Sequence, residues 1–472
     1  MEHLTHYYAD KAAYFLSIGP LPGLRVSTDN STYGNPNYFT DAYTDMAVYE
    51  KDQFNLIQSG RTWYSDKLDY YTRSHRLPSF TFKNLIEGEN ATLRFSLVGR
   101  SSNSRIDFSI LANGEEIGNT YVQKTGKYDY AMDVTRTVSF QPSYPNIDLQ
   151  WNFTPSSTND FAWLDYMSLN VRSALVFDHG QLAFRDPGSI GQGRITRFTM
   201  KNVPRQTFVW DVTNPLRPIN IPLQREGDEI KFVRSTTGLV EMIAFDGTDF
   251  LSIEKGTKIR NQNLHATGNY DMIIVTVPEF KTEADRLATT HNNIGEISAA
   301  VVLLPEIYNE FSSGIQDITA IRDFMKMLYD RGKDQGYPRY LLLFGNASYD
   351  VKNRPGGGGN FVPTYESPNS LRTTVSYLSD DYYGLLDDGE GSNTAGLLDI
   401  GIGRLPVRNL EQAKVLTDKL IYYLTNTPET HGDWRNTIII PADDEDRNTH
   451  LRQAESLADS ISVRYPEFNV DK

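Results

Sequence analysis

YDMIIVTVP, residues 270–278, decides the fold of the C-terminal part of the chain. It is a continuous apolar run, which is typical of a β-strand that is buried on both faces. Further runs of this kind follow, SAAVVLLP, YLLLF and NTIIIP, and helical segments such as DITAIRDFMKMLYDRG, with Asp317 as its N-cap, stand between them. This alternation of strand and helix predicts a mostly parallel sheet with helices on both faces.

Residues 1–173 show a different pattern, in which short strands are separated by turn residues. Apolar and polar residues alternate in ATLRFSLVG and NIDLQWNF, and ANGEEIG carries an Asn-Gly turn signal. The pattern predicts a β-sandwich of jelly-roll type. Residues 174–268 continue with short strands and turns and predict a smaller β module with a polar linker, so that the α/β domain comprises residues 269–472.

Composition excludes several classes of function. A chain of 472 residues is too long for one core, so we expect two to four domains. A net charge of −14 argues against a nucleic-acid partner, and the lack of cysteine removes disulfides and thiolate nucleophiles from this chain. No apolar run approaches the roughly 20 residues of a membrane span. The first residues lack the pattern of a signal peptide, which predicts either a cytoplasmic protein or a start that lies elsewhere.

Ligands of a parallel sheet bind at the carboxyl ends of its strands. Asp443, Asp444 and Asp446 directly follow the run NTIIIP, so we expect their carboxylates at this substrate rim. Two roles are open for them. They either stabilise the start of a helix or attract a cationic group of a substrate.

A second acidic stretch is YLSDDYYGLLDDGEG, residues 377–391. Asp380, Asp381, Asp387 and Asp388 supply the hard oxygen ligands that calcium prefers, and the glycines allow the chain to fold around an ion. The spacing matches no EF-hand loop. A calcium loop and a solvated turn are therefore both open interpretations.

Several segments, taken in order, resemble the gingipain family of cysteine peptidases. They are YDMIIVTVPEF, PRYLLLFGNASYD, LSDDYYGLLDDGEG and DIGIGRLPVRNLEQA, and within the family they are most similar to the sortases of the type IX secretion system. The resemblance is clearest from residue 174 onward. It implies a caspase-like α/β peptidase in which a histidine activates a cysteine, whose thiolate attacks a peptide carbonyl. It also implies a structural calcium ion.

For such a sortase, the resemblance implies removal of C-terminal sorting domains from secreted cargo and attachment of the cargo to surface lipopolysaccharide. The implied partners are this cargo and other outer-membrane components of the secretion system, at the extracellular side of the cell surface. The chain departs from the family because it has no cysteine, and because its pair His431-Gly432 precedes the strand NTIIIP instead of following a strand, which indicates a surface turn and not the catalytic His-Gly pair. We therefore expect a truncated peptidase domain, its first half, that is inactive alone, with no catalytic residue in this chain.

Two other interpretations remain. The chain could be a non-catalytic cell-surface module whose β regions bind glycans or proteins, with the α/β part as scaffold. An α/β domain for a phosphorylated ligand is the third hypothesis, and the lack of a glycine-rich turn between a strand and a helix argues against it.

Overall fold

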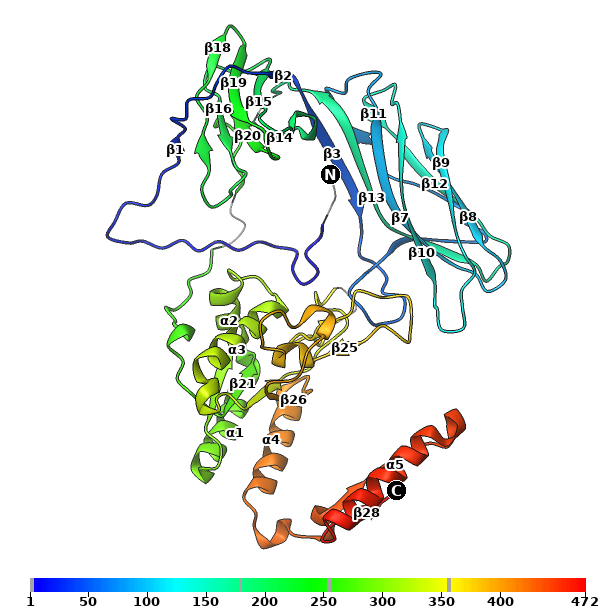
Figure 1. Ribbon diagram of the computed structural model, residues 1–472, viewed down its shortest axis with the longest axis vertical. Helices are drawn as coiled ribbons and strands as arrows, with labels where there is room; N and C mark the ends of the chain where they lie inside the picture. The colour runs from blue at the N-terminus through cyan, green and yellow to red at the C-terminus, as the bar shows by residue number, and fades with distance from the viewer. Residues whose placement is uncertain (1–3, 179, 253–255, 355–357) are drawn as a thin grey trace. The chain divides into compact units, whose positions relative to one another are not determined.

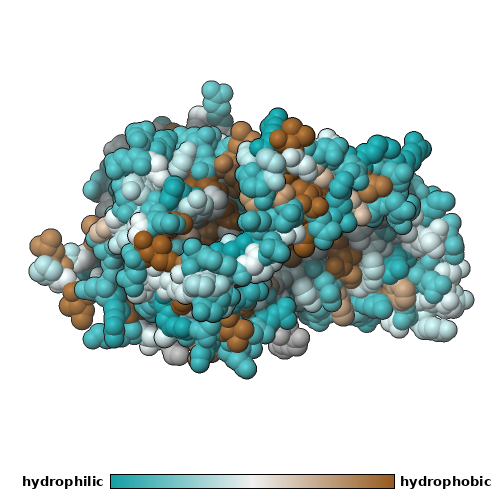
Figure 2. All heavy atoms as spheres, turned by 90° about the horizontal axis from the view of Figure 1, so that it is seen from below, coloured by the Kyte–Doolittle hydropathy of each residue, from teal (hydrophilic) through white to brown (hydrophobic). Residues whose placement is uncertain are grey.

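The structure is a computed structural model that describes residues 4–178, 180–252, 256–354 and 358–472 (Figure 1). The chain folds into two compact units. The β unit comprises Met1–Gln262 with Thr364–Ser379, and the α/β unit comprises Asn263–Pro363 with Asp380–Lys472. The face of the molecule in Figure 2 is mainly hydrophilic, with apolar side chains scattered among polar ones.

The first part of the β unit is a sandwich of two antiparallel sheets. One sheet has the order β10-β7-β13-β3, with β4 also paired to β13, and the other has the order β5-β12-β8-β9. Alternate residues of β8 are buried, so one face of its sheet packs against the core. The Asn-Gly turn joins β8 to β9 as predicted, and both turn residues have positive φ. The strands are β3 (Ala42–Glu50), β4 (Ser65–Asp69), β5 (Ser74–Arg76), β6 (Phe80–Thr81), β7 (Ala91–Arg100), β8 (Ile106–Ala112), β9 (Glu115–Val122), β10 (Met132–Phe140), β11 (Asn146–Ile147), β12 (Leu149–Thr154) and β13 (Phe161–Ala174).

A second core of the β unit lies between two smaller sheets. Their orders are β1-β17-β16-β20-β14 and β18-β19-β15-β2, and stacked Phe198 and Phe232 are buried between them. Two of the strands, β1 and β2, come from residues that precede the first sandwich. The domain boundary at residue 174 stays a prediction. The strands are β1 (Ser27–Thr28), β2 (Tyr38–Thr40), β14 (Gln181–Arg185), β15 (Ile195–Met200), β16 (Phe208–Asp211), β17 (Ile219–Asn220), β18 (Gln224–Glu226), β19 (Glu229–Ser235) and β20 (Glu241–Phe245).

The α/β unit is built on a four-stranded parallel sheet of order β22-β21-β23-β26. Helices α1 and α4 contact each other and pack with Ile274 and Phe344 in one core. Ile273 and Leu343, which point to the opposite face, are fully buried too, so both faces are covered as predicted. The elements are β21 (Met272–Thr276), α1 (Lys281–Ile294), β22 (Ala299–Leu303), α2 (Leu304–Phe311), α3 (Ile318–Gly332), β23 (Tyr340–Phe344), β26 (Gly401–Leu405) and α4 (Leu410–Leu424).

The last elements of the chain do not join this sheet. Strand β27 (Thr437–Ile439) pairs in parallel with β28 (Asn469–Asp471), and α5 (Glu445–Arg464) connects them. The prediction that NTIIIP is buried on both faces is wrong for Ile439, which is 68% exposed. None of the helices within the described ranges is long and apolar enough to cross a membrane.

Candidate functional site

The four parallel strands end at one level. The register pairs Thr276 of β21 with Leu303 of β22 and Phe344 of β23, and it pairs Phe344 with Leu405 of β26. The buried Thr276 hydroxyl donates to the Phe344 carbonyl at 2.8 Å, which joins the two central strands at their ends. This carboxyl edge is where a parallel sheet binds its ligands.

A groove of about 740 Å³ opens at this edge. Its walls are the loops that follow β23 and β26 and the first turns of α4. Polar side chains and apolar ones share the lining. The lining residues are Asn346, Pro406, Val407, Arg408, Asn409, Glu411, Gln412, Val415 and Leu416.

The start of α4 is held by reciprocal capping. The Asn409 side-chain oxygen accepts from the Gln412 backbone N–H at 2.9 Å, and the Gln412 side-chain oxygen accepts from the Arg408 backbone N–H at 2.9 Å. Such capping satisfies N–H groups that a helix start leaves without partners. It therefore fixes the loop that forms one wall of the groove.

Asn346 joins the other wall to the loops around it. Its backbone N–H donates to Val407 O at 2.9 Å, and its carbonyl accepts from Phe361 N at 2.9 Å. Its side-chain amide donates to Gly359 O at 2.8 Å, and only 8% of the residue is exposed. Backbone and side chain together thus hold three separate segments at the carboxyl edge.

Arg404 of β26 is the centre of a polar network at this edge. Its guanidinium binds both carboxylate oxygens of Asp380 at 2.7 Å, and it donates to the carbonyls of Gly345 and Val362 at 2.7 Å and of Pro363 at 3.2 Å. All five N–H donors of the side chain are used, and 13% of the side chain is exposed. A lysine could not replace this geometry because its ammonium is a point charge without the planar fork. Sequence reasoning missed this residue, although a lone arginine in the strand GIGRL was a visible signal.

The carboxylates of the predicted calcium loop are not gathered around one point. Asp380 is held by the guanidinium described above, and Asp388 pairs with Lys326 at 2.9 Å, which keeps the pKa of the Asp388 carboxyl below its usual value. Asp381 opens a short turn, and the Asp387 carbonyl accepts from the backbone of the same loop. Among residues 4–178, 180–252, 256–354 and 358–472, no group of three or more acidic or histidine side chains could hold a metal.

Cations of α3 hold this loop instead. Arg322 donates to Leu385 O at 2.8 Å and to Glu390 O at 3.1 Å, and Lys326 donates to Leu386 O at 3.0 Å. Protein ammonium and guanidinium groups thus supply the positive charge that calcium was predicted to supply. As they are placed, the four aspartates do not fit a calcium ion, and calcium binding by the loop stays a prediction.

Asp443 and Asp444 lie between β27 and α5, Asp446 is the second residue of α5, and all three are exposed. Asp444 precedes the first helical residue without a side-chain capping hydrogen bond, and Asp446 faces His450 at 3.7 Å. Because β27 is not a strand of the four-stranded sheet, the structure does not bring these carboxylates to the groove. Their role at a substrate rim stays a prediction.

The groove can bind a ligand but offers no group for covalent attack. The chain has no cysteine, and no histidine is among the described residues that line the groove. Its arginine, amide and backbone groups are hydrogen-bonding partners, and Val415 and Leu416 supply apolar surface. This set of groups can orient a peptide and cannot form an acyl intermediate with it.

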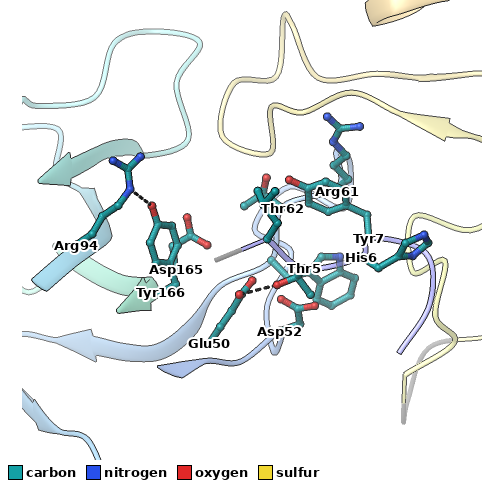
Figure 3. Close-up of a pocket in the computed structure, with 12 residues that line it drawn as sticks. Thr5, His6, Tyr7, Glu50, Asp52, Arg61, Thr62, Arg94, Asp165 and Tyr166 are labelled. Carbon is teal, nitrogen blue, oxygen red and sulfur yellow. Dashed lines mark hydrogen bonds between the residues drawn. The ribbon is translucent and has the colours of Figure 1, made fainter. Parts of the chain in front are cut away.

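A second concave site, of about 230 Å³, lies in the β unit (Figure 3). Asp165 enters it from a bulge of β13, where the pairing with β7 shifts register. Burial raises the pKa of Asp165 to about 7, a hydrogen bond from Ser96 opposes this rise, and the charges of Glu50, Asp52 and Asp133 add to it. The pocket therefore contains a carboxyl that titrates near neutral pH, which sequence reasoning missed because bulges leave no clear mark in an alternating pattern.

Comparisons with known proteins show which proteins this chain resembles. Residues 265–472 match the model of peptidase family C25, the gingipain family. No curated protein matches the chain by sequence. The crystal structure of dimeric latent PorU from Porphyromonas gingivalis matches with a TM-score of 0.75 and 26% identity, over 87% of this chain and 40% of the PorU chain. The resemblance to the gingipain peptidases, and the fold class of β regions followed by a caspase-like α/β part, are confirmed.

Other solved structures match only a part of the chain. The CBM36-1 domain of a multidomain xylanase from the hindgut metagenome of Trinervitermes trinervoides matches with a TM-score of 0.18 and 12% identity, over 26% of this chain and 96% of that domain. The carbohydrate-binding module CBM36 in complex with calcium and xylotriose matches with a TM-score of 0.18 and 11% identity, over 26% of this chain and 98% of the module. Likeness at this level carries no functional argument.

Proposed function

We propose that this chain is the substrate-binding part of a PorU-like cysteine peptidase of family C25. The observation that carries the proposal is the match to PorU, which extends over 87% of this chain and so includes both the β unit and the α/β unit. The chain spans 40% of the length of that PorU chain. The activity of the whole enzyme is therefore inferred from the family.

The geometry of the carboxyl edge supports this role. Polar and apolar side chains line the groove, and the Arg404 network and the capping of α4 hold its walls. Preorganised walls lower the entropic cost of binding a flexible segment. Since the 472 residues include no cysteine, the thiolate that attacks the peptide carbonyl must come from residues outside them.

The substrate class follows from the likeness to PorU and from the resemblance to type IX sortases. In the proposed reaction, a cysteine thiolate attacks the peptide bond before the C-terminal sorting domain of a secreted cargo protein, and the sorting domain leaves with a new amino terminus. The acyl group then passes to water or to an amine of surface lipopolysaccharide, which regenerates the thiol. The proposed location is the extracellular side of the outer membrane, together with other components of the secretion system.

A binding experiment tests this proposal with the chain as it is. A fluorescent reporter fused to the C-terminal sorting domain of a type IX cargo protein is titrated with the purified chain, and anisotropy and gel electrophoresis are followed. We expect saturable binding without cleavage. Val415→Glu, which puts a charge into the groove wall where Val415 is 60% exposed, should weaken binding by about tenfold or more.

Val463→Glu is the matched control, because Val463 of α5 is 81% exposed and does not line the groove. This variant should bind as the unchanged chain does. The proposal fails if the unchanged chain does not bind the fusion, or if both variants weaken binding equally. Binding of glycans by residues 1–173, the alternative function, stays a prediction.

A further inference from the structure

Residues Thr364–Ser379 belong to the β unit, although the chain on both sides of them belongs to the α/β unit. At the base of this arm, β24 (Tyr365–Glu366) pairs in antiparallel fashion with β25 (Leu378–Ser379). Residues 367–377 connect these two strands, and residues 367–376 of this connection are the tip. The arm is therefore a hairpin-like excursion from one unit that folds as part of the other.

Hydrogen bonds hold the tip along its length. Arg61 N donates to Ser367 O at 3.0 Å, and Tyr130 N donates to Leu371 O at 2.8 Å. Further bonds run from Thr62 N to Ser370 Oγ at 2.9 Å, from Thr373 N to Tyr128 O at 3.2 Å, and between Ser376 Oγ and Ser59 Oγ at 2.8 Å. Main-chain bonding of this kind is how proteins bind extended peptides.

Two side chains of the tip act as anchors. Leu371 is 5% exposed, and the Arg372 guanidinium pairs with Asp129 at 3.1 Å. An apolar side chain in a pocket beside a charge pair is the arrangement expected of a peptide ligand and its site. The cluster that receives Leu371 consists of Tyr64, Val98, Ala131 and Trp163.

At Gly60 the tip lies too close to the β unit to leave space for a side chain. Gly60 has φ of +78°, and a Cβ at this position would lie 2.1 Å from Asn369 O. Only glycine lets the tip approach the β unit this closely. Gly88 has nearly the same φ, +80°, and a Cβ there would meet nothing within 4 Å.

The residues that flank the arm are hydrogen-bonded to Arg404. The Arg404 guanidinium binds Pro363 O and the Asp380 carboxylate, which are the residues directly before and after the arm. The same guanidinium holds Gly345 O and Val362 O at the carboxyl edge. The two ends of the arm are therefore covalently joined to residues that this guanidinium holds.

We propose that residues 367–376 are a recognition segment held in a peptide-binding site of the β unit, and that its docking restrains the loops that Arg404 gathers at the groove. The ligand of the site is an extended segment with an apolar residue followed by a base, supplied by the chain itself as Leu371 and Arg372. Release of the segment frees the tip and loosens the groove loops. Docking and release of this segment require no peptidase activity, so this inference is independent of the proposed function.

Hydrogen exchange followed by mass spectrometry tests the docking in the full chain. Gly60→Ala should raise exchange by about tenfold or more at the tip and at Arg61, Thr62 and Tyr130, and to a smaller extent at Asn346. Gly88→Ala controls for the strain of a side chain at positive φ and should change neither region. Equal exchange in the two variants, or a freed tip with unchanged groove loops, would overturn the proposal.

A peptide experiment tests the site separately. Leu371→Asp places a charge in the apolar cluster and should expel the tip while leaving the site intact. A fluorescein-labelled peptide of residues 366–376, ESPNSLRTTVS, should then bind the Leu371→Asp chain and not the unchanged chain, whose site is filled. Adding Asp129→Lys should abolish this binding. A Leu371→Asp chain that keeps the exchange protection of β8 but does not bind the peptide would refute the peptide-binding site.

Discussion

Asp165→Asn should stabilise the β unit at pH 8 and leave its stability unchanged at pH 4. The carboxyl of Asp165 has a pKa of about 7 in the folded chain, chiefly because of burial, against 3.8 as its ordinary value. Between these two values the folded state keeps a proton that the unfolded state has lost. Stability therefore falls as pH rises from about 4 to about 7, and the loss is complete above pH 7.

The size of the effect follows from the pKa difference. A difference of about 3 pKa units at about 1.36 kcal/mol each gives about 4 kcal/mol as an upper limit. Asparagine resembles the neutral acid in shape and does not ionise, so the variant lacks this pH dependence. The difference in unfolding free energy between the variant and the unchanged chain should thus grow from near zero at pH 4 to a few kcal/mol at pH 8.

Urea unfolding followed by tryptophan fluorescence at pH 4 to 8 measures this difference. Four of the five tryptophans report the β unit, namely Trp63, Trp151, Trp163 and Trp210. Glu87→Gln, at an exposed carboxylate of the same unit, is the control and should show no such trend. The reasoning is refuted if the difference in unfolding free energy between Asp165→Asn and the unchanged chain stays constant from pH 4 to 8. It is also refuted if this difference grows toward acidic pH.

Arg404→Gln should destabilise the α/β unit by about 3 to 5 kcal/mol in urea unfolding, because it removes the guanidinium donors of the Asp380 carboxylate and of the Gly345 and Val362 carbonyls. A loss below about 1 kcal/mol would contradict this. Trp151→Ala should lower the unfolding free energy of the β unit, measured by calorimetry, by about 3 to 5 kcal/mol, because Trp151 is 0% exposed. An unchanged unfolding midpoint would contradict the position of Trp151 in the sandwich core. Because Asp380 and Asp388 are each paired with a protein cation, millimolar calcium should not shift the unfolding midpoint measured against EDTA. A rise in the midpoint that Asp387→Asn removes would establish the calcium loop instead.

Features that depend on near neighbours in the chain were predictable. The apolar run at residues 270–278 became the buried strand β21, because its composition suits burial on both faces. Asp317, the predicted N-cap, caps α3 by accepting from Thr319 N at 2.8 Å. Capping acts over three residues, so the sequence carries the whole signal.

The candidate site was predictable only as a location. The rule for parallel sheets predicted the carboxyl edge, but it also placed Asp443 and Asp444 there, and the structure pairs β27 with β28 instead. Whether a strand joins a given sheet depends on long-range pairing, which a local pattern does not contain. The aspartates of residues 380–388 were identified as charged ligands, while the α3 cations that hold their loop come from a distant segment.

The sequence by itself determined which segments are strands and helices, that the chain has two kinds of architecture, and that it supplies no thiolate. These properties follow from composition and from periodicities of two and 3.6 residues. Only the tertiary structure decided that Arg404 gathers four carbonyl and carboxylate partners, that Asp165 is half-buried near other acids, and that residues 364–379 fold with the β unit. Each of these depends on groups that are far apart in the chain, as Arg61 and Ser367 are, and such contacts form only when the cores bring them together.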